Sequence, residues 1–118
     1  MTKKCSRDYG KTLDEGSVEH GVTDRLGREV GYRWRIREVF YRERTPEQDG
    51  SYGYFNRPDD QPEMVFEMWG SPTRDGSKYG PAFNYTEFLT LEEARRAAVK
   101  RVEQAAKRDT KKFTKVPA

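Results

Sequence analysis

The sequence predicts an α+β fold, with an antiparallel sheet of three to five strands packed on one C-terminal helix. Three observations support this prediction. Apolar and polar residues alternate in several segments before residue 90, which is typical of strands. One later segment has the spacing and the end signals of a helix. Only 33% of the 118 residues are hydrophobic, while 13% are aromatic, so we expect a small core of large side chains.

The first two strands are predicted to form a hairpin. Alternation at 18–23 indicates a short strand, and "DRLGR" at 24–28 is a turn in which Gly27 can take a positive φ. A longer strand follows at about 29–44. Two strands joined by a short turn favour antiparallel pairing.

Further strands are expected at 63–69 and 82–88, and "YGYF" at 52–55 is either a short strand or an aromatic loop. The segments between them are rich in glycine, proline and polar residues, which predicts loops. These loops cover residues 45–51, 56–62 and 70–81.

The helix is predicted over 90–108. Thr90 is a suitable N-cap and Glu93 follows three residues later, as in a capping box. A narrow apolar stripe with helical spacing would face the sheet. It consists of Leu91, Ala94, Ala98, Val102 and Ala105. Because these side chains are mostly small, the helix can lie close to the sheet.

The chain is expected to form one domain with two loose ends. Residues 1–16 are mostly polar and lack periodicity, so we expect a flexible N-terminal arm. Residues 17–108 would form the single α+β domain, and 109–118 a flexible basic tail. A small sheet with exposed edges also allows a homodimer to form through edge pairing.

The composition predicts a cytoplasmic protein without a membrane partner. The single cysteine, Cys5, cannot form an internal disulfide, which favours a reducing compartment. No apolar run approaches the ~18 residues that a membrane-spanning helix needs. The first ten residues also lack the apolar segment of a signal peptide.

The residue types do not favour an enzyme, a metal site or a cofactor. His20 is the only histidine, and with one cysteine the chain lacks the ligands of a structural zinc site. The least unlikely enzyme is a metal-dependent nuclease. Asp59 and Glu67 faintly resemble the acids of PD-(D/E)xK nucleases, but Trp69 stands where those enzymes have lysine.

The strongest functional pattern is a row of arginines in "GYRWRIREV". Arg33, Arg35 and Arg37 alternate with apolar residues, so they would lie on one strand face about 6.6 Å apart. Guanidinium groups match phosphate oxygens well. We therefore predict contact with nucleic acid or a nucleotide, with Tyr41 as a stacking residue and Lys111 and Lys112 adding nonspecific attraction.

Two alternatives to phosphate contact remain open. Glu63 and Glu67 could pair with the arginines from a neighbouring strand and neutralise them. Alternatively, the same face could bind a protein. Possible anchors for a protein partner are the aromatic residues Tyr52, Tyr54, Phe55 and Tyr79.

Charge is unevenly distributed along the chain. Residues 27–44 carry a net charge of +3, residues 45–93 a net −7 and residues 94–118 a net +7. The acidic middle either pairs with the basic segments inside the fold or forms a second face.

The run "FLTLEEARRA" at Phe88–Ala97 resembles the strand–helix junction of AP2-type domains and of the arm-type DNA-binding domains of phage integrases. The resemblance implies a three-stranded sheet on a C-terminal helix, with Arg and Trp side chains of the sheet contacting DNA. By analogy, Arg33, Arg35 and Arg37 would be those contacts. The chain is also similar in general character to phage accessory proteins of the anti-defence type. That similarity implies a host protein or a sequestered anionic nucleotide as the alternative partner.

Overall fold

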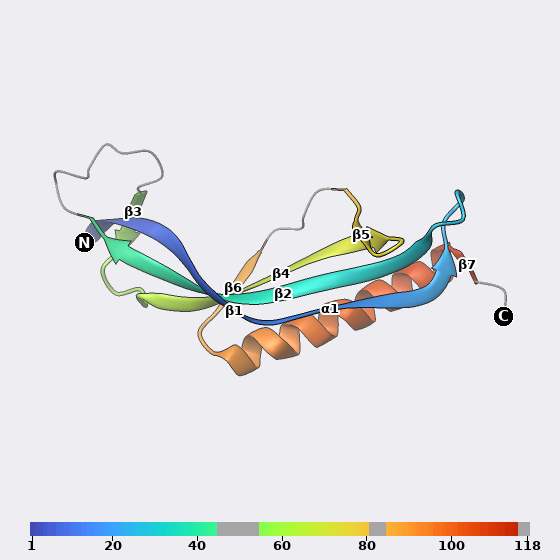
Figure 1. Cartoon of the computed structure of the whole chain (residues 1–118). Coiled ribbons are helices and arrows are strands. Elements are labelled where there is room, and N and C mark those ends of the chain that lie inside the picture. The colour runs from blue at the N-terminus through green and yellow to red at the C-terminus, as the bar shows by residue number, and fades with distance from the viewer. Residues whose placement is uncertain (45–54, 81–84, 116–118) are drawn as a thin grey trace.

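The computed structural model describes residues 1–44, 55–80 and 85–115, and it confirms the α+β fold class. A curled antiparallel sheet packs on one C-terminal helix (Figure 1). The predicted anchors Tyr52 and Tyr54 lie outside the described residues. The elements are β1 (Thr2–Thr23), β2 (Glu29–Glu43), β3 (Phe55–Pro58), β4 (Met64–Arg74), β5 (Ser77–Lys78), β6 (Thr86–Phe88), α1 (Leu91–Lys112) and β7 (Thr114–Lys115).

The sheet has the strand order β3-β1-β2-β4-β5, with β6 added to β4 and β7 added to β1. All of these pairings are antiparallel. The predicted β1–β2 hairpin is confirmed. Its turn is held by Asp24 Oδ1, which accepts hydrogen bonds from the backbone N–H groups of Leu26 and Arg28 at 2.9 and 3.0 Å.

The prediction of a flexible N-terminal arm at 1–16 is wrong. These residues form most of β1, a strand of 22 residues that pairs with β2 over nearly its whole length. Register shifts near Tyr9, Thr12 and Glu19 show why the alternation was hidden. Each of the first two shifts inserts one extra residue of β1 and moves the following side chains to the other face, whereas the third inserts two residues.

The predicted loop at 70–81 is also largely wrong. Strand β4 continues to Arg74 and turns through Asp75 and Gly76, whose φ values are 52° and 78°, into β5. Two positive φ values in a two-residue connection are the mark of a hairpin turn that follows the twist of the strands. Glycine and proline in this segment therefore signalled a hairpin and not an open loop. Similarly, part of the predicted 56–62 loop is strand β3.

The C-terminal helix is longer than predicted. Thr90 caps it as expected, with Thr90 Oγ1 accepting a hydrogen bond from the Glu93 N–H at 3.2 Å. At the other end the helix runs on to Lys112, and β7 then pairs with Val22 and Thr23. The basic tail predicted from residue 109 is thus helix and strand as far as Lys115, because Asp109 is buried against the sheet.

Two clusters of buried residues lie on opposite faces of the sheet. Ile36 and Met68 pack on Ala94 and Ala98 of α1, with Trp34 beside them. Since side chains alternate along β2, Val39 and Tyr41 point to the other face, where they pack with Val65. Of the apolar residues that alternate with the arginines of β2, Val30, Tyr32 and Ile36 are buried and Trp34 is partly buried.

The molecule is elongated. Its principal extents are 61 × 28 × 22 Å and its radius of gyration is 18.2 Å, whereas a compact chain of this length has a radius of about 13 Å. Figure 1 shows the reason: α1 covers the half of the sheet that carries β5 and β7, and the half with β3 extends beyond the helix.

The C-terminal end of α1 is attached to β1 through a buried polar pair. His20 Nε2 lies 3.5 Å from Asp109 Oδ2, and the two side chains are only 2% and 6% exposed. Burial lowers the pKa of His20; Arg108 acts in the same direction, while the charges of Asp109 and Glu19 oppose it. His20 is therefore a packed structural residue.

Gly31→Ala should destabilise the sheet. A Cβ at this position would stand 2.5 Å from the Val18 carbonyl oxygen and 2.7 Å from Thr73 Oγ1, so strands on both sides of β2 would have to move. We expect a loss of about 1–3 kcal/mol in urea unfolding. Ser17→Ala, on the exposed surface of β1, is the control and should change stability by less than about 0.5 kcal/mol. Equal stabilities would contradict the close packing at Gly31.

His20→Gln should remove a pH dependence of folding. Because the folded pKa of His20 is lowered, the unfolded chain binds the proton first. The wild-type free energy of unfolding should therefore be highest above about pH 6.5 and should fall as the pH drops below that value. Urea titrations across this range should show a smaller slope for His20→Gln. As His20 is the only histidine, an unchanged slope would show that its proton is not linked to folding.

Candidate nucleic-acid interface

The arginine row predicted on β2 is divided by its neighbour β4. In the β2–β4 register, Arg37 pairs with Glu67, Arg35 with Trp69, and Arg33 with Ser71. All of these side chains lie on the sheet face away from α1, because Trp34 and Ile36 between them pack on the helix side. Each arginine of the row therefore has a different cross-strand neighbour on β4.

Arg37 is neutralised within the fold. Its Nε donates to Glu67 Oε1 at 3.0 Å, and its guanidinium lies 3.5 Å from the centroid of the Tyr9 ring. Glu67 is 2% exposed, so the pair is shielded from water on the carboxylate side. The prediction of Arg37 as a phosphate contact is therefore corrected, and the alternative of pairing with Glu67 holds for this arginine. Glu63 remains exposed and does not join the row.

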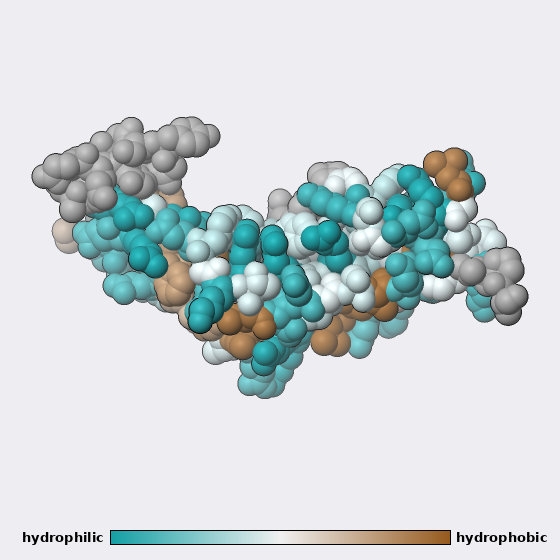
Figure 2. Space-filling model, viewed as in Figure 1, coloured by the Kyte–Doolittle hydropathy of each residue, from teal (hydrophilic) through white to brown (hydrophobic). Residues whose placement is uncertain are grey.

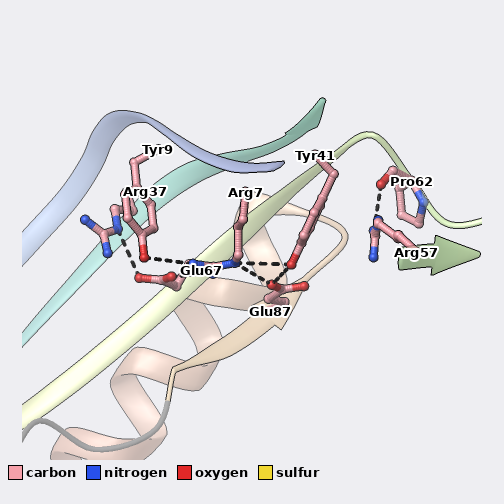
Figure 3. A network of polar contacts seen from close by, with 8 residues as sticks. All are labelled: Arg7, Tyr9, Arg37, Tyr41, Arg57, Pro62, Glu67 and Glu87. Carbon is pink, nitrogen blue, oxygen red and sulfur yellow. Dashed lines mark hydrogen bonds and ion pairs between the residues drawn. The ribbon is translucent and has the colours of Figure 1, made fainter. Parts of the chain in front are cut away.

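A partly buried network extends from Glu67 to the other strands (Figure 3). Arg7 of β1 donates to Glu67 Oε2 at 2.5 Å and to Glu87 Oε1 at 3.2 Å. Glu67 and Glu87 are direct partners across β4 and β6, so two like charges stand opposite each other. Arg7 lies between them and removes the repulsion that this pairing would otherwise cause.

The environment of the network shifts two pKa values. Burial by itself lowers the pKa of Arg7, but hydrogen bonds to Glu67 and Tyr41 and the charge of Glu67 outweigh it and raise the pKa above its usual value. Burial raises the pKa of Tyr41, and its hydroxyl donates a hydrogen bond to Glu87. Arg7 thus stays charged and Tyr41 stays protonated.

Tyr41 does not serve as the stacking residue that the sequence suggested. Its side chain is 8% exposed, with Arg57 over its ring at 3.7 Å and the edge of Phe55 at 5.9 Å. Phe55, a predicted partner contact, likewise packs on Tyr41, although it retains some exposed surface. Tyr41 belongs to the second core, whereas Phe55 is exposed beside it.

Arg33 and Arg35 have a different environment from Arg37. Their guanidinium carbons lie 5.3 and 5.4 Å from the centroid of the Trp69 ring, and Lys78 Nζ lies 5.8 Å from it. Neither arginine forms an ion pair within the described part of the chain, and Arg35 Nε is buried without a hydrogen-bond partner there. Arg33, Arg35 and Trp69 line a hollow of about 260 Å³ together with Glu15, Gly16, Ser17, Trp34 and Gly76.

A second hollow at the end of the molecule is lined by both Lys112 and Tyr79. The sequence predicted Lys112 as a nucleic-acid contact and Tyr79 as a contact to a protein partner. This hollow lies between the β1–β2 turn, the end of β4 and the end of α1. Lys111 is exposed on the last turn of the helix, next to Lys112. The structure therefore places the basic end of α1 apart from the Arg33–Arg35 hollow.

Sequence reasoning missed Trp69 and Lys78 as members of the arginine site. Trp69 lies two residues after Glu67 on β4, so its side chain is on the same face. A register that places Glu67 beside Arg37 therefore also places Trp69 beside Arg35. Lys78 gave no such signal, because its position depends on the unforeseen β4–β5 hairpin. Arg7 was missed because β1 was expected to begin after it.

Glu67, one of the two acids predicted for a nuclease site, is occupied by other contacts. Both carboxylate oxygens of Glu67 accept hydrogen bonds from arginines. Among residues 1–44, 55–80 and 85–115, no three His, Cys, Asp or Glu side chains come together as a metal site.

In the same ranges, no helix combines the length and the apolar character needed to cross a membrane.

Arg7→Met should strongly destabilise the fold, because it leaves Glu67 buried beside Glu87 with one cation fewer. Arg7 is 13% exposed, and breaking a buried pair of this kind costs about 3–5 kcal/mol. Denaturant unfolding would measure the loss. Adding Glu87→Gln should recover part of the stability, since it removes the opposing charge.

The exposed pair Arg96–Glu92 provides the control for this experiment. Both side chains are 74% exposed, so Arg96→Met should change stability by less than about 1 kcal/mol. If Arg7→Met were equally mild, the network would not hold the strands together.

Comparisons of the chain with protein-family models, with curated proteins and with solved structures gave no match.

Proposed function

We propose that the chain is a non-enzymatic nucleic-acid-binding module whose sheet face contacts phosphates through Arg33 and Arg35. One observation carries the proposal: two adjacent guanidinium groups rest on Trp69 without a carboxylate partner in the described part of the chain, while Arg37 beside them is paired. A fold that pairs one arginine of a row and leaves two available presents a defined basic site.

The contacts of the two arginines favour a phosphate ligand. Packing on Trp69 reduces the side-chain freedom that would be lost on binding. A buried donor without a partner, such as Arg35 Nε, costs about 1–3 kcal/mol, and an acceptor from the ligand would recover this. Phosphate oxygens accept such bonds in the paired geometry that guanidinium offers.

The size of the hollow favours a polymer over a sequestered nucleotide. At about 260 Å³ it is smaller than the roughly 300–1,000 Å³ of pockets that enclose small ligands. A nucleic-acid chain needs only surface contact at each phosphate. The strongly basic segment 94–118, with its net charge of +7, would add long-range attraction.

The arrangement also agrees with what the resemblance at Phe88–Ala97 implies. That junction is a strand end, a Thr90 cap and a helix start, as in the AP2-type and integrase arm domains it resembles. The implied DNA contacts are Arg and Trp side chains of the sheet, and Arg33, Arg35 and Trp69 lie together on the face away from α1.

A host protein as the partner is supported less well. On the face shown in Figure 2, hydrophilic residues predominate and apolar residues form separate small patches. Protein interfaces usually centre on a larger desolvated apolar cluster.

The buried free thiol of Cys5 suits the reducing cytoplasm, which we propose as the compartment.

The double variant Arg33→Ala/Arg35→Ala should bind nucleic acid weakly. Fluorescence anisotropy at low salt should show a loss of roughly tenfold or more, since hydrogen bonds to charged groups contribute about 1.5–3 kcal/mol each. The slope of log affinity against log salt should also decrease by about 1.4 for a single strand, because two phosphate contacts are removed.

Arg95→Ala/Arg96→Ala is the matched control, since it removes the same charge from the exposed side of α1. It should change affinity much less. Equal losses for the two double variants would mean that only net charge matters. Absence of binding by the wild-type chain at low salt, to duplex or single strands, would end the proposal.

A further inference from the structure

The second hollow, at the end of the molecule, has the composition of a nucleic-acid subsite. Its volume is about 360 Å³, and four of its side chains are basic while one is acidic. We refer to it as the tip hollow. It is lined by Asp24, Arg25, Leu26, Arg28, Arg74, Tyr79, Lys112 and Phe113.

Aromatic rings and cations are interleaved in the tip hollow. The Tyr79 ring lies 4.3 Å from the guanidinium carbon of Arg74 and 5.1 Å from that of Arg28. The Phe113 ring lies 5.1 Å from Arg74 and 5.2 Å from Lys112 Nζ. Tyr79 is 42% exposed, so part of its ring remains available to a ligand.

The Asp24 carboxylate orients two arginines of this hollow, and the hollow still keeps a positive net charge. Asp24 Oδ2 accepts from Nε of Arg28 at 2.8 Å and from Nε of Arg74 at 3.2 Å. These bonds orient both side chains from one edge. With Arg25 and Lys112 included, the group keeps a net charge of +3.

The β4–β5 hairpin connects the tip hollow with the arginine site. Lys78 lies over Trp69, while the next residue, Tyr79, lines the tip hollow. On the other side of the turn, Gly76 lines the first hollow and Arg74 the second. From Trp69 to Arg74 the distance along β4 is about 17 Å at ~3.3 Å per residue, and the two side chains lie on opposite faces of the sheet, so a ligand that reaches both hollows passes around the β4–β5 edge.

We infer that the tip hollow is a second subsite for the same nucleic-acid strand, and that this strand is single. The tip hollow holds an unpaired base on Tyr79 and a phosphate near Lys112, while Arg33 and Arg35 hold phosphates farther along the strand. A duplex hides its base faces in the stack, whereas a single strand can offer them to an aromatic ring. This inference rests on the proposed function and adds the form of the ligand.

Anisotropy with labelled oligothymidine tests the inference, using lengths of ~4 and ~16 nucleotides, an abasic strand and a duplex of the longer length. Tyr79→Ala should weaken binding of the long oligothymidine by roughly 5- to 150-fold, as expected for loss of one stacked base. It should leave the abasic strand and the duplex unchanged. Tyr79→Phe should bind like the wild type.

Leu89→Ala is the control, because Leu89 is an exposed apolar residue that lies outside both hollows. It should not alter the preference for oligothymidine. The wild-type chain gives a test without any substitution: it should bind the long oligothymidine more tightly than the short one, the abasic strand or the duplex.

The outcomes separate the two proposals. If the wild type binds no nucleic acid at low salt, the proposed function fails. If Arg33→Ala/Arg35→Ala weakens binding but Tyr79→Ala does not, or if Tyr79→Ala weakens the abasic strand equally, the tip subsite is overturned and the phosphate site stands. Tighter binding of the duplex than of the single strand by the wild type would also overturn the inference.

Discussion

The position of Arg7 between Glu67 and Glu87 is the interaction on which the rest of the structure depends. Strand β6 has only three residues, and it leads directly into α1. Its pairing with β4 brings two carboxylates together, which would be unfavourable without a cation between them. Because the cation comes from β1, the network links the start of the chain to the entry of its only described helix.

The same network decides which arginines of β2 are available. Glu67 has two carboxylate oxygens, and Arg7 and Arg37 take one each. No further carboxylate follows on β4 beside Arg35 and Arg33, where the partners are Trp69 and Ser71. The basic character of the face is therefore concentrated at the half of β2 that α1 supports from behind. On the other side of β2, Glu15 of β1 stands opposite Arg35 and lines the same hollow.

The fold class, the first hairpin and the helix cap could be predicted because each depends on residues close in sequence. The length of β1 could not, since its register shifts interrupt the alternation that identifies a strand. The site was predicted in part for a similar reason. Alternation places Arg33, Arg35 and Arg37 on one face, but the pairing of Arg37 depends on the β2–β4 register. The contact of Lys78 with Trp69 depends on a hairpin whose glycine and proline suggested a loop.

The elongated shape has a consequence for how the molecule opens. The core that α1 covers and the core around Val39 and Val65 share strands but lie toward different ends, so they need not lose protection together in amide hydrogen exchange. The end with β3 has fewer buried apolar residues and should exchange first. Arg33 and Arg35 stand on the helix-backed end, behind Trp34 and Ile36. A transient opening of the β3 end would therefore leave the binding face intact.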